Sequence, residues 1–413
     1  MPPIASNPDP PRRSVFRALL AAVLAQAILA GLSAGPRLVV GTEDTDLYHR
    51  YAARILAGQV PYRDFLVEYP PLALAFFVVP AALSRDVASF KRAFAVEMFA
   101  CNALCVGLVA RWAARHPGRR SVARVLGWYT GFFLILGRLV VTKYDAAPML
   151  IGFAATLGWA AGRPRLGGVG AALGALTKVY PAALALVALG GAGDRPPRQG
   201  RLWSGRGLGA FVLTSLLGAA AWVGLGGGRG VAESIRFQSG RGFEYGSLAS
   251  GGQMLAARLL GAPIAITRDH SSFATVTPWS GALLGCVFPI QAACLAGICW
   301  VHHRRGGREL IRYSAAAVLG FIAAGKVFSP QFLIWLIPFV TLLEGPVGRR
   351  ARWLFLAVCA VTLLAPGVLS FCSRTSLAAI CAYNGRNILV GWLLILLIFG
   401  PPAAQDSRVR PEG

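Results

Sequence analysis

Long runs of apolar residues, separated by short polar segments, repeat along almost the whole chain. A helix of about 20 mostly apolar residues is long enough to cross a bilayer. The runs predict spans at residues 15–34, 93–112, 122–141, 146–161, 207–226, 277–301, 313–325, 331–344, 353–370 and 387–402. With two shorter stretches, this makes roughly 10–13 hydrophobic segments, which indicates an all-α polytopic membrane protein.

The two shorter stretches do not fit a simple series of crossings. Residues 70–84 are flanked by Pro and are short for a span, so either they form a re-entrant segment or one Arg cluster departs from the usual orientation rule. Residues 167–190 have Arg on both flanks and break at Lys178-Val-Tyr-Pro181, with halves too short to span alone. They predict a broken helical hairpin.

Composition supports this fold class, since 55% of the 413 residues are hydrophobic and 14% are charged. So high an apolar content excludes a single-span receptor, a disordered scaffold and a coiled coil. The chain has 41 Lys and Arg against 17 Asp and Glu, a net charge of +24, but its Arg residues fall in short clusters between apolar runs. This is the positive-inside pattern, so we expect no nucleic acid as a partner.

The Arg clusters also orient the chain when they are placed in the cytoplasm. Both termini then lie inside. One membrane domain at 1–402 includes a first external loop at 35–69 and a second external segment at 227–276, and a cytoplasmic tail follows at 403–413. Polar and aromatic residues crowd the segments assigned outside. We therefore expect a multi-pass cell-membrane protein whose active site faces outward.

The first external loop contains a predicted amphipathic helix. Leu47, Tyr51 and Ile55 recur at helical spacing, and Gly58 suits a C-terminal cap. Asp46 precedes this pattern and has two interpretations: an N-cap of the helix, or a general base held at the membrane surface.

Charged residues follow closely in residues 61–71, where Arg63, Asp64 and Glu68 lie among aromatic side chains next to an apolar run. They could form an internal ion pair that anchors the loop. A carboxylate so near an apolar run is costly unless it is paired, which favours a specific role. In the second external segment, residues 236–250 are similarly polar, either as an ordinary loop or as part of a site.

Several ionisable residues lie within or beside apolar segments: Arg138, Lys143, Asp145, Lys178 and Lys326. A charged residue within or beside a membrane span usually indicates a functional site. Taken one at a time, each of these residues could instead extend its charged end to the membrane surface. Cations gathered at the outer leaflet suit a phosphate or pyrophosphate group.

The order of these motifs resembles glycosyltransferase family 87 of the GT-C superfamily, the polyprenol-phosphate-mannose-dependent mannosyltransferases. The matching residues are Asp46, Tyr48, Gly58, Pro61-Tyr-Arg-Asp-Phe, Glu68-Tyr-Pro-Pro, Lys143-Tyr-Asp145, Lys178-Val-Tyr-Pro181 and Lys326-Val-Phe-Ser-Pro-Gln331. The resemblance implies a GT-C-type helical bundle with a large first external loop. It also implies transfer of a hexose, mannose in the family, from a polyprenyl-phosphate-sugar donor to a glycan or glycolipid acceptor.

The same resemblance implies roles for individual residues. Asp46 would be the general base, with Asp44 as the other half of a D-x-D-like motif. Lys326, Lys178, Arg138 and Lys143 would hold the departing polyprenyl phosphate, and Asp145, Asp64 and Glu68 would bind sugar hydroxyls or brace the loop. The remaining candidate substrate-binding residues are Tyr48, Arg63, Tyr180, Arg241, Glu244 and Gln331.

No cofactor is expected, since a polyprenyl monophosphate donor does not require a metal ion, although a D-x-D pair can hold one and the metal requirement stays open. The alternative function is a transporter or flippase for a lipid-linked sugar or another anionic substrate, because broken helices and membrane-embedded cations also occur there. The sequence shows no internal repeat, which favours the enzyme.

Overall fold

The computed structural model describes residues 12–34, 43–116, 121–190, 200–269, 272–368 and 373–402. Helices dominate these residues, which confirms the all-α polytopic class. The predicted tail at 403–413 and the beginning of the first external loop, 35–42, lie outside them.

Six helices in the described residues are long and apolar enough to cross a membrane. They are α1 (Arg12–Ala34), α4 (Val87–Arg115), α5 (Val122–Thr142), α9 (Gly200–Gly240), α11 (Ser280–Arg304) and α15 (Leu377–Phe399). The other helices are α2 (Glu43–Leu56), η2 (Pro71–Leu74), α3 (Ala75–Ala82), α6 (Ala146–Ala160), α7 (Pro164–Thr177), α8 (Pro181–Gly190), α10 (Leu248–Leu259), α12 (Leu310–Ala323), η4 (Pro330–Leu336), α13 (Ile337–Leu342) and α14 (Gly345–Val368).

The two short stretches take the forms that their length suggested. Residues 70–84 form η2 and α3, a short apolar helix followed by the long α4, and whether they are re-entrant stays a prediction. The predicted broken hairpin is present as α7 and α8, interrupted at Lys178. Its halves pack closely, because a Cβ on Gly174 would lie 2.8 Å from Cβ of Pro181.

The predicted end at 226 agrees with the structure, because α9 breaks at Gly227, where φ is +67°, before a second helical segment runs to Gly240. Other predicted boundaries were wrong because hydropathy detects only the apolar part of a helix. The helices α14 and α15 begin at Gly345 and Leu377 rather than at 353 and 387. In both α14 and α15 the helix extends beyond the apolar stretch into more polar sequence.

The second external segment also departs from the all-helical expectation, because it contains a small antiparallel sheet. The strands are β1 (Phe243–Glu244), β2 (Ala265–Asp269) and β3 (Ser272–Val276), in the order β1-β3-β2. Phe243 pairs with Thr275, and Ala265 pairs with Val276.

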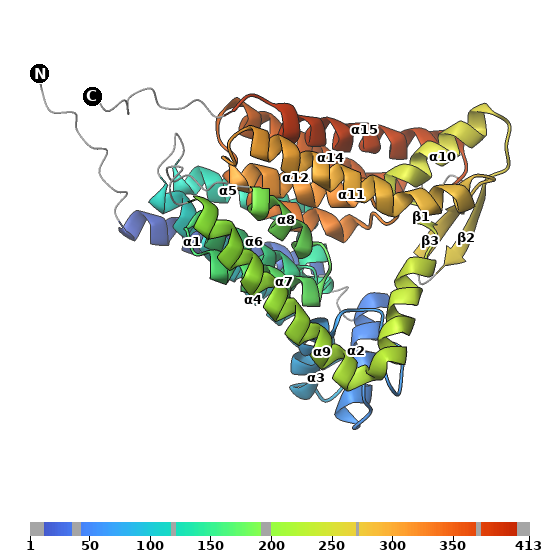
Figure 1. Cartoon of the computed structure of the whole chain (residues 1–413), viewed down its shortest axis with the longest axis horizontal. Helices are drawn as coiled ribbons and strands as arrows, with labels where there is room; N and C mark the ends of the chain where they lie inside the picture. The colour runs from blue at the N-terminus through green and yellow to red at the C-terminus, as the bar shows by residue number, and fades with distance from the viewer. Residues whose placement is uncertain are drawn as a thin grey trace, which may run out of the picture.

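Figure 1 shows how these parts are arranged. The amphipathic α2 lies with α3 at the lower tip, and α12, α14 and α15 form a layer at the top. The first half of α9 descends to the tip, and its second half rises toward the sheet. The α9 helix, kinked at Gly227, therefore passes both α2 and the sheet.

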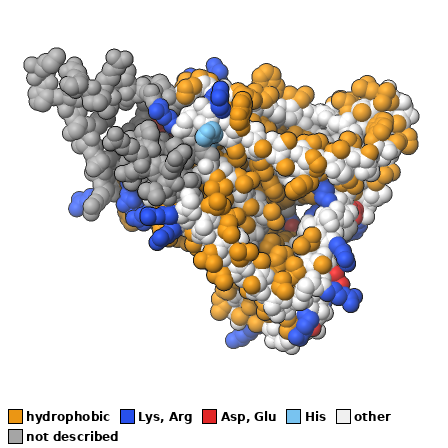
Figure 2. Space-filling model, viewed as in Figure 1, with side chains coloured by type: hydrophobic (Ala, Val, Ile, Leu, Met, Phe, Trp, Pro, Cys, Tyr) orange, Lys and Arg blue, Asp and Glu red, His pale blue; other side chains and the backbone are white. Residues whose placement is uncertain are grey.

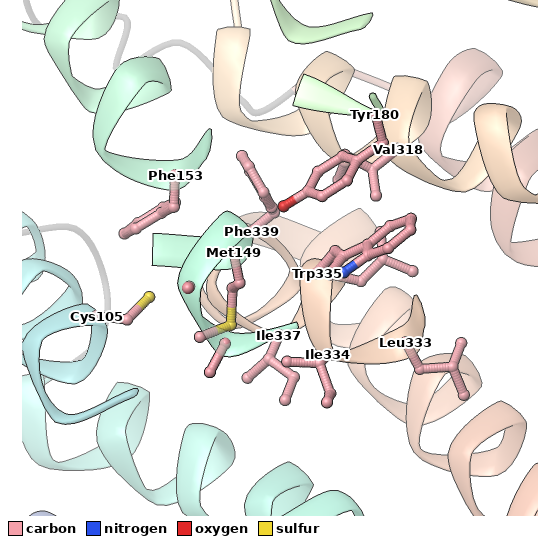
Figure 3. Close-up of a cluster of buried hydrophobic side chains, with 14 of the residues drawn as sticks. Cys105, Met149, Phe153, Tyr180, Val318, Leu333, Ile334, Trp335, Ile337 and Phe339 are labelled. Carbon is pink, nitrogen blue, oxygen red and sulfur yellow. The ribbon is translucent and has the colours of Figure 1, made fainter. Parts of the chain in front are cut away.

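The surface and the core both fit a membrane protein. Figure 2 shows hydrophobic side chains over most of the visible face, with Lys and Arg at the lower tip and along the rising half of α9. Exposed apolar surface of this extent is expected where helices meet lipid. In the interior, Met149, Phe153, Tyr180, Trp335 and Phe339 pack together where α6, α8, η4 and α13 meet (Figure 3).

Candidate functional site

The helix α2 positions the acidic residues Asp44 and Asp46. It begins at Glu43, so the N-cap interpretation of Asp46 was wrong and Asp46 lies within the first turn. Its other end is capped as predicted: Gly58 has φ +85°, its N–H donates to Ile55 O at 2.9 Å, and Gln59 N–H donates to Arg54 O at 3.0 Å. This pair of bonds is a Schellman motif, which ends the helix.

Asp44 and Asp46 reach different cations. Oδ2 of Asp44 lies 2.5 Å from Nζ of Lys143, and Oδ1 of Asp46 lies 2.8 Å from Nζ of Lys91. Residues two apart on a helix point to different sides, so the two carboxylates do not form a single pincer. Among the described residues, no group of three His, Cys, Asp or Glu side chains could hold a metal ion.

Two helix breaks bring further charges to Asp44. Lys143 and Asp145 lie in the turn between α5 and α6, and Lys178 lies at the break between α7 and α8. Nζ of Lys178 lies 2.6 Å from Oδ1 of Asp145, and the charges of Asp44 and Lys143 also act on Lys178. We call Asp44, Lys143, Asp145 and Lys178 the paired-charge cluster.

Aromatic side chains enclose the Lys178 end of this cluster. Nζ of Lys178 lies 4.6, 4.8 and 4.9 Å from the ring centroids of Tyr144, Phe332 and Trp335. Nε1 of Trp335 also donates to Oδ1 of Asp145 at 2.8 Å. The ammonium is therefore stabilised by one carboxylate and by cation–π contacts in a largely dry environment.

The predicted Tyr48 and Tyr180 are both buried in aromatic packing. Tyr48 is 1% exposed and stacks on Phe77 at a centroid distance of 4.3 Å. Tyr180 stacks on Trp335 at 4.0 Å, as Figure 3 shows, and its hydroxyl donates to Pro148 O at 2.9 Å. These rings form the walls behind the paired-charge cluster.

Arg63 and Asp64 form the internal ion pair that the sequence allowed. Nε of Arg63 lies 2.9 Å from Oδ1 of Asp64, and Val60 N–H donates to Oδ2 at 2.7 Å. The hydrogen bond from Arg63 and the one from Val60 lower the pKa of Asp64. Both residues are exposed and brace the loop.

The rest of this loop is fixed against α9. Tyr62 has φ +69° and lies so close to α9 that a Cβ on Gly226 or Gly230 would overlap it. Farther along, Gln238 Nε2 donates to the backbone oxygen of Glu68 at 2.7 Å. The charge of Glu68 acts on Tyr69 and Tyr144, which places its carboxylate near the aromatic wall.

A second group of predicted residues meets at the break after α12. Nζ of Lys326 donates to the backbone oxygens of Ser239 and Arg241 at 2.7 and 2.8 Å. Glu244 Oε1 accepts a hydrogen bond of 2.8 Å from Ser329, and burial raises the pKa of Glu244. This arrangement fastens residues 239–244 to the break after α12.

The two groups are linked through η4, where Phe332 N–H donates to Ser329 O at 3.0 Å. Arg138 is exposed on α5 and Gln331 is half-buried in η4. In the described part of the chain, Arg138 makes no ion pair.

Sequence reasoning missed Lys91, Phe332 and Trp335. Lys91 had a detectable signal, since it is a lone cation between Phe90 and Phe94 near the start of a long apolar helix. The two aromatic residues gave no such signal, because aromatic side chains in apolar segments are common.

No protein-family profile and no curated protein matches this sequence. The structure is similar to that of "ArnT from Cupriavidus metallidurans bound to Undecaprenyl phosphate", with 15% sequence identity and a TM-score of 0.49. The similarity covers 92% of this chain and 76% of the ArnT chain.

Proposed function

We propose that the protein is a membrane hexosyltransferase of the GT-C type. It transfers a hexose from a polyprenyl-phosphate-sugar donor to a glycan or glycolipid acceptor on the outer face of the membrane. Mannose is the proposed sugar. The observation that carries this proposal is the paired-charge cluster, in which Lys143 and Lys178 come together from two helix breaks beside the acidic helix α2. The sequence motifs that resemble glycosyltransferase family 87 include all of these segments.

The two lysines suit a phosphate leaving group. Each ammonium has a carboxylate partner, so the cluster is close to neutral before a donor binds. A donor phosphate gains negative charge as its bond to the sugar breaks, and preformed cations stabilise that charge most strongly where water is excluded. Lys178 comes close to this condition, because its side chain is only 17% exposed and three aromatic rings surround its ammonium.

Asp46 is the proposed general base. Its side chain is 38% exposed, and the ion pair with Lys91 engages Oδ1, so part of the carboxylate remains open to an acceptor. The acceptor oxygen attacks the anomeric carbon, the bond to the phosphate oxygen breaks and its electron pair leaves with the polyprenyl phosphate. Asp46 takes the acceptor's proton. A single displacement of this kind inverts the anomeric configuration. Asp44 holds Lys143 in place.

The test is transfer of labelled sugar from polyprenyl-phosphate mannose and polyprenyl-phosphate glucose in membranes that contain the wild type, Asp46→Asn or Asp44→Asn. We expect transfer by the wild type and a loss of about a hundredfold or more in Asp46→Asn, as for a missing general base. Glu233→Gln is the matched control, because Glu233 is an exposed acid that pairs with Arg229 on α9.

Other outcomes would revise the proposal in defined ways. A collapse in Asp44→Asn with activity retained in Asp46→Asn would move the base to Asp44. Retained donor stereochemistry in the product would contradict a single displacement. Absence of transfer from both donors would contradict the enzyme function, and flipping of a lipid-linked sugar would then be measured.

A further inference from the structure

Lys91 occupies an unusual position for a lysine. It lies in the second turn of α4, on the face that also buries Phe90, Phe94 and Met98, and its side chain is only 7% exposed. A buried ammonium is costly unless it is paired and hydrogen-bonded. A long apolar helix therefore tolerates Lys91 only with a partner that offsets this cost.

The partner is Asp46 on α2, with Nζ and Oδ1 2.8 Å apart. Aromatic contacts on both sides fix the two helices at this point: Tyr48 lies 5.4 Å from Phe94, and His49 lies 5.0 Å from Phe90, measured between ring centroids. The carboxylate of Asp46 is thus held from the protein interior by a buried cation, while 38% of its side chain is exposed.

We propose that Lys91 is the positioning residue for Asp46 in the transfer reaction, an assignment that rests on the proposed function. The ammonium fixes the carboxylate through Oδ1, so that Oδ2 faces the acceptor hydroxyl. During transfer the acceptor proton moves to Oδ2 as the new glycosidic bond forms. Lys91 keeps its own protons throughout and does not contact the substrate.

The location of Lys91 separates it from the proposed phosphate site. Asp44 and Asp46 lie two residues apart on α2 and point to different sides, and only Asp44 reaches Lys143. Lys91 therefore supports the base from one side of α2, and Lys143 and Lys178 form the cationic group on another. A role for Lys91 through Asp46 predicts an effect on turnover and not on donor affinity.

The experiment compares kcat and the donor KM for the wild type, Lys91→Met, Lys91→Arg and the double variant Asp46→Asn/Lys91→Met. We expect Lys91→Met to lower kcat by about ten- to a hundredfold with the donor KM changed by less than about twofold. Lys91→Arg restores most of kcat, because it returns a cation to Oδ1. The double variant is no slower than Asp46→Asn alone, since Lys91 acts only through Asp46.

Arg92→Met is the matched control, because Arg92 is the next residue on α4 and is exposed. It removes one cation from the same turn, and we expect kcat to stay at the wild-type value. If Lys91→Met does not accumulate in the membrane, Lys91→Gln takes its place, since the amide still donates to Oδ1 and is expected to give an intermediate kcat.

Three results would overturn the assignment while leaving the enzyme function intact. They are a Lys91→Met variant as active as Arg92→Met, an increased donor KM with kcat unchanged, and a double variant slower than Asp46→Asn by the full Lys91→Met factor. No transfer by the wild type would instead overturn the proposed function, and this assignment with it.

Discussion

Replacing Asp145 by Asn removes the carboxylate that lies 2.6 Å from the ammonium of Lys178 and leaves that ammonium in an almost dry pocket. The side chains of Asp145 and Lys178 are 2% and 17% exposed. Loss of one member of a buried ion pair typically costs about 3–5 kcal/mol, because the other charge remains buried. The substituted amide still accepts from Trp335, so this contact is kept.

The expected loss for Asp145→Asn lies near the lower end of that range. The three rings around Lys178 remain in the variant and stabilise the ammonium by cation–π contacts. We expect Asp145→Asn and Lys178→Met each to lower the free energy of unfolding by about 3 kcal/mol. The double variant leaves no charge unpaired, so its loss should not exceed that of either single variant, about 3 kcal/mol, and the coupling energy should be at least about 3 kcal/mol.

The assay is a double-mutant cycle on the free energy of unfolding, measured by SDS titration in mixed micelles. The exposed pair Arg229 and Glu233 on α9 supplies the control cycle, with an expected coupling energy of about 0.3–0.5 kcal/mol. Losses at Asp145 and Lys178 that simply add, or a coupling energy as small as that of the control, would refute the interpretation of this pair as a buried ion pair.

Two further predictions concern packing and pH. Gly230→Ala places a Cβ against the backbone of Tyr62 and should cost about 1–3 kcal/mol of stability through overpacking. In Gly228→Ala the new Cβ meets nothing within 4 Å, so this variant should gain up to about 1 kcal/mol of helix stability. Equal midpoints of thermal unfolding for the two variants would contradict this contrast. Burial raises the pKa of Glu244 above its ordinary value of 4.5, so its contribution to stability is present at pH below 4.5 and is lost as pH rises through the raised pKa. Glu244→Gln should weaken this decline and stabilise the protein at neutral pH, and parallel pH curves for the two proteins would count against the buried carboxyl.

Much of the helical architecture could be predicted from the sequence because it depends on local pattern. Run length and helical spacing predicted the α2 amphipathic helix, the break at Lys178 and the cap at Gly58, and each is present. Boundaries in more polar sequence were missed, as at the start of α15 at Leu377, because backbone hydrogen bonding continues where the apolar signal ends.

The candidate site was only partly predictable, for a different reason. The sequence identified Lys143, Asp145 and Lys178 as charges near apolar segments, since charge in such places is costly and therefore conspicuous. Asp44 was a candidate only through the family resemblance. The sequence could not assign the partners of these residues. Trp335 donates to Asp145 across 190 residues of sequence, and Lys91 was missed as the partner of Asp46.

The sequence by itself therefore determined that the chain is a helical membrane protein with charged breaks between its helices, because bilayer thickness and helical period act on neighbouring residues. The tertiary structure alone decided that Asp44 meets Lys143 while Asp46 meets Lys91, and that a small sheet forms between residues 243 and 276 beside Lys326. Such pairings join residues that are far apart in the sequence. They become favourable only when the segments that carry these residues pack into one core, so local sequence pattern does not reveal them.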